Sequence, residues 1–358
     1  MEGHARQRHA RFDRSRLRRP ASRLIGVVSG LLVSLSILAG SSAIAAGRDE
    51  ADASGWRDGT LQALAGEIRA EGVTAFLILR KGRPVAAWGD VSRKVNVASI
   101  RKSLLSALYG IQVADGRIRL ASTLGALGID DTAPGLTPAE QRATVRDLLM
   151  ARSGIYHPAA SETASMRRKR PPRGSHEPGT FWYYNNWDFN ALGTIYRQAT
   201  GEDIFESFAR RIATPIGMED FSAADGRYVD AAASRHPAYR FALSARDLAR
   251  FGQLVLDGGA WQGRRILPAD WLRESTRPYS RTDHDDLGYG YLWWTLDAER
   301  FGPDAVMALG HGGQKLAILP EKQLVVVQLI EKRDGPHRDR TAIFLDQLAR
   351  ILAAAPSG

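Results

Sequence analysis

Residues 96–111 read Asn96-Val-Ala-Ser-Ile-Arg-Lys-Ser-Leu-Leu-Ser-Ala-Leu-Tyr-Gly-Ile111, and they decide how the rest of the chain is interpreted. Ser99 is a residue type that often precedes a helix. The apolar residues that follow it recur at helical spacing, at Leu104, Leu105, Leu108 and Ile111. Asp115-Gly116 supplies an end, because glycine readily adopts the left-handed conformation that terminates helices. The stretch therefore predicts an apolar helix that starts at Ser99.

Ser99 and Lys102 stand three residues apart, so the hydroxyl and the amine would be neighbours on this helix. A serine hydroxyl becomes a good nucleophile only when a base takes its proton. A buried lysine can be that base, because desolvation disfavours the ammonium and lowers its pKa. The partial positive charge of the helix N-terminus would also stabilise a developing oxyanion.

The alternative interpretation of this pair is a surface serine that is followed by a lysine by chance. A four-residue pattern with two unspecified positions is not specific by itself. Two observations favour catalysis. Ser99 is the only serine with a lysine three residues later, and the segment around it is too apolar for a solvated helix.

The chain has 358 residues, enough for one large domain or two smaller ones, and 44% of them are hydrophobic. Its net charge of +10 belongs mainly to the first 23 residues, which hold eight arginines against Glu2 and Asp13. The remainder is only weakly basic, so a nucleic acid is not expected as a partner. The absence of cysteine excludes disulfides, lipid attachment at a thiol and cysteine metal sites.

Residues 1–45 have the pattern of an export signal. A basic region ends at Arg23, an apolar run covers residues 24–39, and small residues follow up to a cleavage site near Ala45–Ala46. The alternative is an uncleaved membrane anchor, although the run is short for a full membrane span. Cleavage would make the mature protein periplasmic or secreted, with membrane contact only through an uncleaved leader.

Strand patterns gather near both ends of the chain, and helical patterns lie between them. Helices are expected at 60–70, 144–152, 190–200, 204–212, 244–256, 270–275 and 339–354. Strands are expected at 75–80, 84–88, 288–295, 317–320 and 324–330. This order predicts one α/β (α+β) domain over residues 46–358. Its antiparallel sheet would come from both termini, with a helical insertion at roughly 105–240.

Residues 156–180 are predicted as a long loop rich in proline, serine and glycine, and Arg167-Arg-Lys-Arg170 lies inside it. Long loops in compact domains tend to be functional or disordered. The basic run is either a solvated stretch or a surface that steers an acidic substrate.

Two further stretches could join Ser99 in a site. Residues 178–186 read Pro178-Gly-Thr-Phe-Trp-Tyr-Tyr-Asn-Asn186 and place Tyr184 and Asn186 in a Tyr-x-Asn pattern before a predicted helix. Gly310-His-Gly-Gly-Gln314 is a glycine-rich turn that leads into a strand, and glycines there allow a substrate to approach the backbone.

Together the three motifs resemble those of the serine β-lactamase and penicillin-binding protein superfamily. The Tyr-x-Asn form is similar to the class C branch, which includes D-alanyl-D-alanine carboxypeptidases, D-aminopeptidases, esterases and 6-aminohexanoate-dimer hydrolases. The likeness runs from about residue 60 to the C-terminus. It implies the β-lactamase/transpeptidase-like fold and an exported serine hydrolase that needs no metal or other cofactor.

The resemblance also implies roles for individual residues. Ser99 would be the nucleophile that forms an acyl-enzyme, and Lys102 would accept its proton or hold Tyr184 as a phenolate. Tyr184 would be the general base, and Asn186 would hydrogen-bond Lys102 and the substrate amide. On the third motif, His311 and Gly313 would border the substrate, and the Gln314 N–H would join that of Ser99 in the oxyanion hole.

Two registers of the tyrosine motif are open, because Tyr183 and Asn185 fit it as well. Tyr184 with Asn186 is preferred, since it keeps the resemblance's spacing from Pro178. Either tyrosine could instead be an aromatic core residue.

The third motif departs from the β-lactamase pattern, because His311 stands where lysine is usual. Histidine has an ordinary pKa of about 6.5, so it is mostly neutral at pH 7 and supplies little attraction for a substrate carboxylate. Short esters, simple amides or short peptides are therefore the expected substrates. D-alanyl-D-alanine carboxypeptidase or β-lactamase activity is the alternative.

Other classes of protein fit the sequence less well. The chain has no Gly-x-Ser-x-Gly elbow of an α/β-hydrolase and no His-Glu-x-x-His zinc motif. A non-catalytic peptidoglycan-binding envelope protein remains as a rival from a different class. Loss of Ser99, Lys102 or Tyr184 would have favoured that rival, and all three are present.

Overall fold

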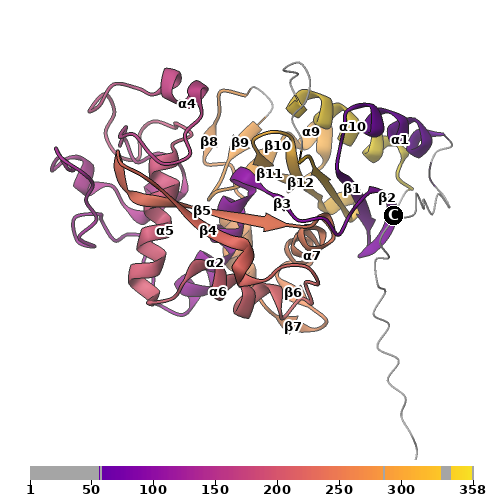
Figure 1. Cartoon of the computed structure of the whole chain (residues 1–358), viewed down its shortest axis with the longest axis horizontal. Helices are drawn as coiled ribbons and strands as arrows, with labels where there is room; N and C mark the ends of the chain where they lie inside the picture. The colour runs from indigo at the N-terminus through magenta and orange to yellow at the C-terminus, as the bar shows by residue number, and fades with distance from the viewer. Residues whose placement is uncertain (1–55, 57–58, 285–286, 332–339, 357–358) are drawn as a thin grey trace, which may run out of the picture. The chain divides into compact units, whose positions relative to one another are not determined.

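The sheet that both ends of the chain build is the centre of the fold in the computed structural model, which describes residues 56, 59–284, 287–331 and 340–356 (Figure 1). Its strand order is β2-β1-β13-β12-β11-β10-β9-β8, and each pair of neighbouring strands is antiparallel. The strands are β1 (Ala75–Arg80), β2 (Arg83–Gly89), β8 (Ser280–Arg281), β9 (Leu287–Tyr289), β10 (Trp294–Leu296), β11 (Val306–Gly310), β12 (Gln314–Leu319) and β13 (Leu324–Leu329). The predicted fold class and the sheet from both termini are confirmed.

Strands β1, β12 and β13 are buried along almost their whole length, which explains why their sequences are continuous apolar runs. Helices cover both faces of these strands. On one face Phe344 of α10 (Arg340–Ala354) meets Phe76 of β1, with ring centroids 6.3 Å apart. On the other face α7 (Ala245–Leu256) lies so close that a Cβ on Gly252 would come within 2.6 Å of Val325. Helix α1 (Thr60–Ala70) packs beside α10 (Figure 1).

The remaining elements hold the segments that carry the motifs. The helices are α2 (Arg101–Ala114), α3 (Val145–Leu149), α4 (Ala164–Lys169), α5 (Asn186–Thr200), α6 (Ile204–Phe208), α8 (Ala269–Ser275) and α9 (Ala298–Phe301). A second sheet has the order β3-β5-β4, and a two-stranded ribbon pairs β6 with β7. These strands are β3 (Val95–Asn96), β4 (Gly226–Ala231), β5 (Ser234–Leu243), β6 (Ala260–Trp261) and β7 (Arg264–Arg265).

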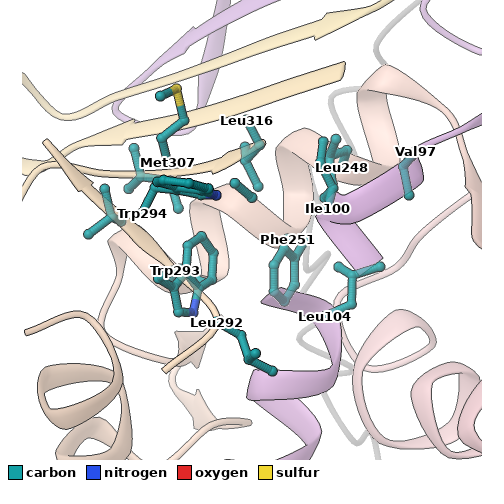
Figure 2. Packing of buried hydrophobic residues seen from close by; sticks show 14 of the residues in the cluster. Val97, Ile100, Leu104, Leu248, Phe251, Leu292, Trp293, Trp294, Met307 and Leu316 are labelled. Atoms are coloured by element: carbon teal, nitrogen blue, oxygen red, sulfur yellow. The ribbon is translucent and has the colours of Figure 1, made fainter. Parts of the chain in front are cut away.

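The start of α2 is anchored in the core between α7 and the large sheet (Figure 2). Ile100 and Leu104 lie beside Leu248 and Phe251 of α7, and all four side chains are fully buried. Phe251 stacks on Trp293 with a centroid distance of 6.2 Å and an interplanar angle of 9°. This packing fixes the position of Ser99, which directly precedes Ile100.

Several element predictions are confirmed: α1, the β1–β2 and β12–β13 hairpins, α7 with Ser244 as its N-cap, and α10. Others were wrong in extent. The predicted helix over 144–152 ends at Leu149, whereas the one over 204–212 is confirmed, as α6 up to Phe208 and then a π-helical turn over Ala209–Ala213. Helix α5 starts at Asn186 rather than residue 190.

Two further predictions need correction, and one pair of strands was missed. The predicted strand 288–295 is instead two paired strands, β9 and β10, with a turn between them at which Leu292 has a φ of +65°. The loop 156–180 contains the short helix α4. The β4–β5 hairpin was not predicted, because Pro237 inside β5 argues against a strand.

The leader, residues 1–45, lies outside the described residues, as does the predicted cleavage site. No helix in the described segments is long and apolar enough to cross a membrane. The helical insertion at 105–240 stays a prediction.

Candidate active site

Ser99 sits in a 3₁₀ turn, Ala98–Ile100, that enters α2, rather than at the N-cap of a regular helix. Ala98 before it has a φ of +50°, in the left-handed region that residues with a Cβ rarely adopt. The Ala98 N–H donates to Asn96 Oδ1 at 3.0 Å, which helps to hold this turn. Such backbone strain is often found at functional sites, where the surrounding structure holds it in place.

Lys102 contacts three other residues of the candidate site. Its Nζ lies 3.0 Å from Ser99 Oγ, 2.7 Å from the Tyr184 hydroxyl and 2.9 Å from Asn186 Oδ1. The lysine is only 1% exposed, and its Nζ also lies 4.2 Å from the centroid of the Phe189 ring. The structure thus brings together four predicted site residues from two distant segments of the chain.

The two segments meet through the start of α5. Asn185 is the N-cap, and its side-chain oxygen accepts the Trp187 N–H at 3.1 Å. Asn186 follows as the first helical residue, and its Nδ2 donates to the Ser161 carbonyl at 2.8 Å. This bond turns Asn186 Oδ1 towards Lys102, because the amide nitrogen is already committed.

The two tyrosines of the motif have different partners. Tyr184 reaches Lys102, whereas the Tyr183 hydroxyl donates to the Met166 carbonyl at 2.7 Å. Aromatic rings fix Tyr184 from several sides: Trp294 stacks on it at 5.3 Å and Tyr289 meets it edge-on at 6.0 Å. The structure therefore brings Tyr184, and not Tyr183, to the nucleophile.

Burial drives both ionisable partners of Ser99 towards their neutral forms. It lowers the pKa of Lys102 well below its ordinary value, and the nearby Arg101 guanidinium lowers it further. Burial also raises the pKa of Tyr184 to about 12, although a hydrogen bond with Ser99 and the charge of Arg101 act in the opposite direction. Burial therefore favours a neutral amine and a neutral phenol in the resting pair.

A neutral Lys102 has two N–H donors and one lone pair, yet it faces three oxygens. Asn186 Oδ1 can only accept, so it takes one N–H. One hydroxyl, from Ser99 or Tyr184, then takes the other N–H, and the remaining hydroxyl donates to the lone pair. The arrangement can thus receive a proton from Ser99 directly or through Tyr184 without moving any heavy atom.

The third motif forms the tight turn between β11 and β12, directly beside the nucleophile turn. A Cβ on Gly310 would collide with the carbonyl oxygen of Val97, so only glycine permits this approach. Gly313 has a φ of +101° and lies against Ile330. The Gln314 side chain is bonded twice to the Ile330 backbone, which leaves its main chain as the part that could contact a substrate.

Ser99 opens into a cavity of about 970 Å³. One wall is aromatic and includes Trp182, Tyr279 and Trp294, while a second part of the lining is charged and includes Arg152, Arg281 and Asp283. A third part, next to the nucleophile, consists of His311, Lys315 and Thr341.

Lys315 was missed in the sequence, where only His311 was weighed as the charged group of the third motif. It lies on β12, is 3% exposed, and its Nζ donates to Thr341 Oγ1 of α10 at 2.7 Å. No local pattern marks it, because its place at the cavity depends on the pairing of β11 with β12. The cavity therefore holds a lysine despite the histidine in the motif.

The basic run in the loop 156–180 is largely paired within the protein. Arg170 donates to both carboxylate oxygens of Glu162, and Lys169 Nζ lies 2.6 Å from Asp283 Oδ2 across the chain. This pairing weakens the interpretation that the run steers an acidic substrate. In the segments that the structure describes, no group of three or more histidines or carboxylates could hold a metal ion.

Comparisons with known proteins identify the family and the fold of the chain. The model of the beta-lactamase family matches residues 58–350. A 6-aminohexanoate-dimer hydrolase from Paenarthrobacter ureafaciens is 34% identical over 124 residues, which cover 31% of this chain and 31% of that relative. The chain thus aligns with about a third of the length of that curated relative.

Solved structures show the same fold. A candidate 6-aminohexanoate-dimer hydrolase from Bacillus anthracis has a TM-score of 0.63 at 20% identity, and the match covers 82% of this chain and 83% of that one. The octameric penicillin-binding protein homologue from Pyrococcus abyssi has a TM-score of 0.63 at 19% identity, covering 83% and 77% of the two chains.

Proposed function

The chain belongs to the beta-lactamase family, and on this basis we propose that it is a serine hydrolase that cleaves esters or amides through an acyl-enzyme on Ser99. The observation that carries the proposal is the contact of one buried amine, Lys102 Nζ, with the hydroxyls of both Ser99 and Tyr184. A nucleophile with a base in hydrogen-bond reach, and a third group that orients the base, is the arrangement that covalent catalysis needs.

Acylation begins when Ser99 Oγ attacks the substrate carbonyl carbon and its proton passes to Lys102 Nζ, directly or through Tyr184. The carbonyl oxygen becomes an oxyanion, for which the backbone N–H groups of Ser99 and Gln314 are the proposed donors. As the bond to the leaving group breaks, the leaving oxygen or nitrogen keeps the electron pair. It then takes the proton back from the Lys102–Tyr184 pair.

Deacylation repeats the sequence with water. The neutral Lys102–Tyr184 pair takes a proton from the water, whose oxygen attacks the acyl carbon. The same pair then returns a proton to Ser99 Oγ as the ester bond breaks. Asn186 keeps Lys102 in place through both halves and is the proposed contact for a substrate amide.

The substrate class is proposed from the cavity and from the relatives. The cavity is lined by aromatic rings together with Arg152, Arg281 and Lys315, so it suits a substrate with apolar and anionic parts. The name of the Paenarthrobacter relative suggests linear amide oligomers as candidates. Because Lys315 could hold a carboxylate, D-alanyl-D-alanine carboxypeptidase or β-lactamase activity stays the second candidate.

Labelling tests the proposal most directly. A fluorophosphonate should add its mass to the peptide that contains Ser99 and should no longer react with Ser99→Ala. Ser165 also lines the cavity, so Ser165→Ala is the matched control and should still be labelled at Ser99. A label on any other residue, or full hydrolytic activity of Ser99→Ala, would contradict the proposal. The latter result would leave the non-catalytic binding protein or another mechanism as the explanation.

A panel of substrates then separates the candidates. It should contain p-nitrophenyl butyrate, a linear aminohexanoate dimer, a D-alanyl-D-alanine peptide and a penicillin. Faster turnover of the penicillin than of the ester would favour the second candidate. We also propose that the protein is exported, on the basis of the sequence of residues 1–45.

A further inference from the structure

Arg101 is a buried charge that the proposed chemistry does not use. Its residue is 3% exposed, between Ile100 and Lys102 at the start of α2. Its Nη2 donates to Asn190 Oδ1 at 2.9 Å, and its guanidinium carbon lies 4.2 Å from the centroid of the Tyr239 ring. Asn190 is itself fixed, because its Nδ2 donates to the Ala160 carbonyl at 3.1 Å.

The partners of Arg101 carry no negative charge. An amide oxygen and an aromatic face hold the guanidinium, and its buried Nη1 has no hydrogen-bond partner among the residues that the structure describes. Arg246 shows the usual arrangement, with Glu219 at 2.8 Å and Asp220 at 2.5 Å from its guanidinium nitrogens. A buried cation without a carboxylate is costly, and an apolar residue of similar length would be the more stable choice. Packing alone therefore does not explain Arg101.

The groups around Arg101 determine where its charge acts. It influences Lys102 on its own helix, Tyr184 before α5, Tyr239 and Arg240 on β5, and Tyr289 on β9. Of these groups, Arg240 is another cation and burial keeps the three tyrosines neutral, so none of them cancels the charge of Arg101. Lys102 therefore experiences an uncompensated positive neighbour.

We propose that Arg101 is a positioning residue that acts through Lys102: its fixed charge adds to the effect of burial in favouring the neutral lysine, and it drives the proton from protonated Lys102 to the leaving group. The inference rests on the proposed roles of Ser99 and Lys102. According to this inference, the charge of Arg101 determines how readily Lys102 accepts and then releases the proton in the two proton transfers of acylation. In the first, the proton leaves Ser99 Oγ for Nζ as the new C–O bond forms. In the second, it leaves Nζ for the departing oxygen or nitrogen.

The charge should matter most for poor leaving groups. An alkoxide or an amide nitrogen must be protonated as it departs, whereas p-nitrophenolate is stable enough to leave as the anion. Removal of the charge should therefore slow ethyl butyrate hydrolysis more than p-nitrophenyl butyrate hydrolysis. It should also let Lys102 hold its proton to higher pH, so the acidic limb of the kcat/KM profile should move upward.

The experiment compares Arg101→Gln, Arg101→Met and Arg101→Lys with Arg246→Gln as the matched control. For the two neutral variants we expect the acidic limb to move up by about one pH unit, the size that a neighbouring charge typically causes. At neutral pH, kcat/KM for ethyl butyrate should fall at least ~10-fold more than for p-nitrophenyl butyrate. Arg101→Lys should keep the wild-type limb, and Arg246→Gln should move only the unfolding temperature.

Thermal unfolding distinguishes a role of Arg101 in catalysis from a role in the stability of the fold. Arg101→Met should unfold at the wild-type temperature or above it, because it removes a buried charge that lacks a counterion. An unchanged acidic limb in both folded neutral variants would overturn the inference, as would an equal shift in Arg246→Gln. If Arg101→Met does not fold, Arg101→Gln still tests the charge, because its amide can keep a bond to Asn190.

Failure of the role proposed for Arg101 can be distinguished from failure of the proposed function. Fluorophosphonate labelling of the wild type at Ser99 with no shift in the Arg101 variants would overturn the role of Arg101 alone. Absence of any label on wild-type Ser99 would overturn both.

Discussion

Tyr183 and Tyr184 are neighbours in the chain but bond to different groups, which gives a test at the scale of single residues. Tyr184→Phe and Lys102→Ala should each lower kcat by roughly 10²- to 10⁴-fold, because each removes part of one proton-transfer unit. The double variant should be little worse than either single one. Tyr183→Phe should be mild, since its hydroxyl donates to the Met166 carbonyl and not to the proton-transfer unit. Steady-state kinetics would contradict this assignment if the two tyrosines ranked in the reverse order.

Lys315 should act on substrate binding rather than on chemistry. Lys315 lines the cavity together with His311 and Thr341, and its Nζ donates to Thr341 Oγ1, so a substrate carboxylate there would gain a charged partner. Lys315→Met should raise KM for a carboxylate-bearing substrate about 10-fold and leave KM for p-nitrophenyl butyrate within about twofold. A matching rise for both substrates would mean that the lysine supports the cavity wall and does not bind carboxylates.

The sequence predicted some residues of the candidate site better than others. Ser99, Lys102 and Tyr184 lie in motifs with recognisable spacing, and the structure joins them by hydrogen bonds. Arg101 and Lys315 have no such spacing. Their burial and their neighbours follow from tertiary packing, which a local pattern does not contain.

At the scale of elements, the close contact between the third motif and the turn that carries Ser99 limits which residue can stand at position 310. Gly310→Ala would push a methyl group into the Val97 carbonyl, and both atoms belong to the main chain. The two turns would have to separate, so kcat should fall at least ~10-fold while the circular dichroism spectrum stays native. Gly66→Ala is the control, because its Cβ on α1 would meet nothing within 4 Å. That variant should gain about 1 kcal/mol of stability and keep full activity.

Two buried histidines join other elements to α5 and should make the protein sensitive to acid. His157 and His236 lie 6.0 Å and 5.2 Å from the Trp187 ring, centroid to centroid. Burial lowers both pKa values, although Glu140 raises that of His157 and Asp131 raises that of His236. The unfolded chain therefore binds more protons than the folded one below about pH 6.5, and stability falls as the pH drops.

The two histidines should accordingly lower the unfolding temperature between pH 7 and pH 5, whereas Asp188, whose pKa burial raises well above its ordinary value, acts in the opposite direction. The nearby carboxylates Asp131 and Glu140 do not contribute in this window, because their pKa values lie below the ordinary ones. His157→Asn with His236→Asn should flatten the decrease, as differential scanning calorimetry can measure. An equally steep fall of the unfolding temperature with pH in the double variant would mean that other groups cause the sensitivity to acid.

Helices and strands were predicted correctly where a single hydrophobic pattern dominated the sequence. α7 has a capped start and a regular apolar face, and β13 is a continuous apolar run, so both were predictable. Prediction failed where tertiary contacts override local signals. Strand β5 tolerates Pro237 and pairs with β4 and β3, and the aromatic stretch 288–295 folds back on itself around Leu292.

At the scale of the whole molecule, export can be tested on the protein from its producing cell. The mature chain should begin near Ala46, because small residues precede that position and a basic and an apolar segment come before them. N-terminal sequencing of the purified protein measures this start. A chain that begins at Met1 and stays in the membrane fraction would indicate an anchor instead.

The pairing of β1 with β13 has a consequence for the order in which this protein is made. Residues 75–80 leave the ribosome well before residues 324–329, with which they pair. Until then β1 can pair with β2 on one side only, and β12 also lacks one neighbour. A product that terminates before Leu324 would expose two long apolar strand edges of the kind that aggregate. The central sheet is therefore completed only when residues 324–329 have been made, because β13 is the strand that joins β1 to β12.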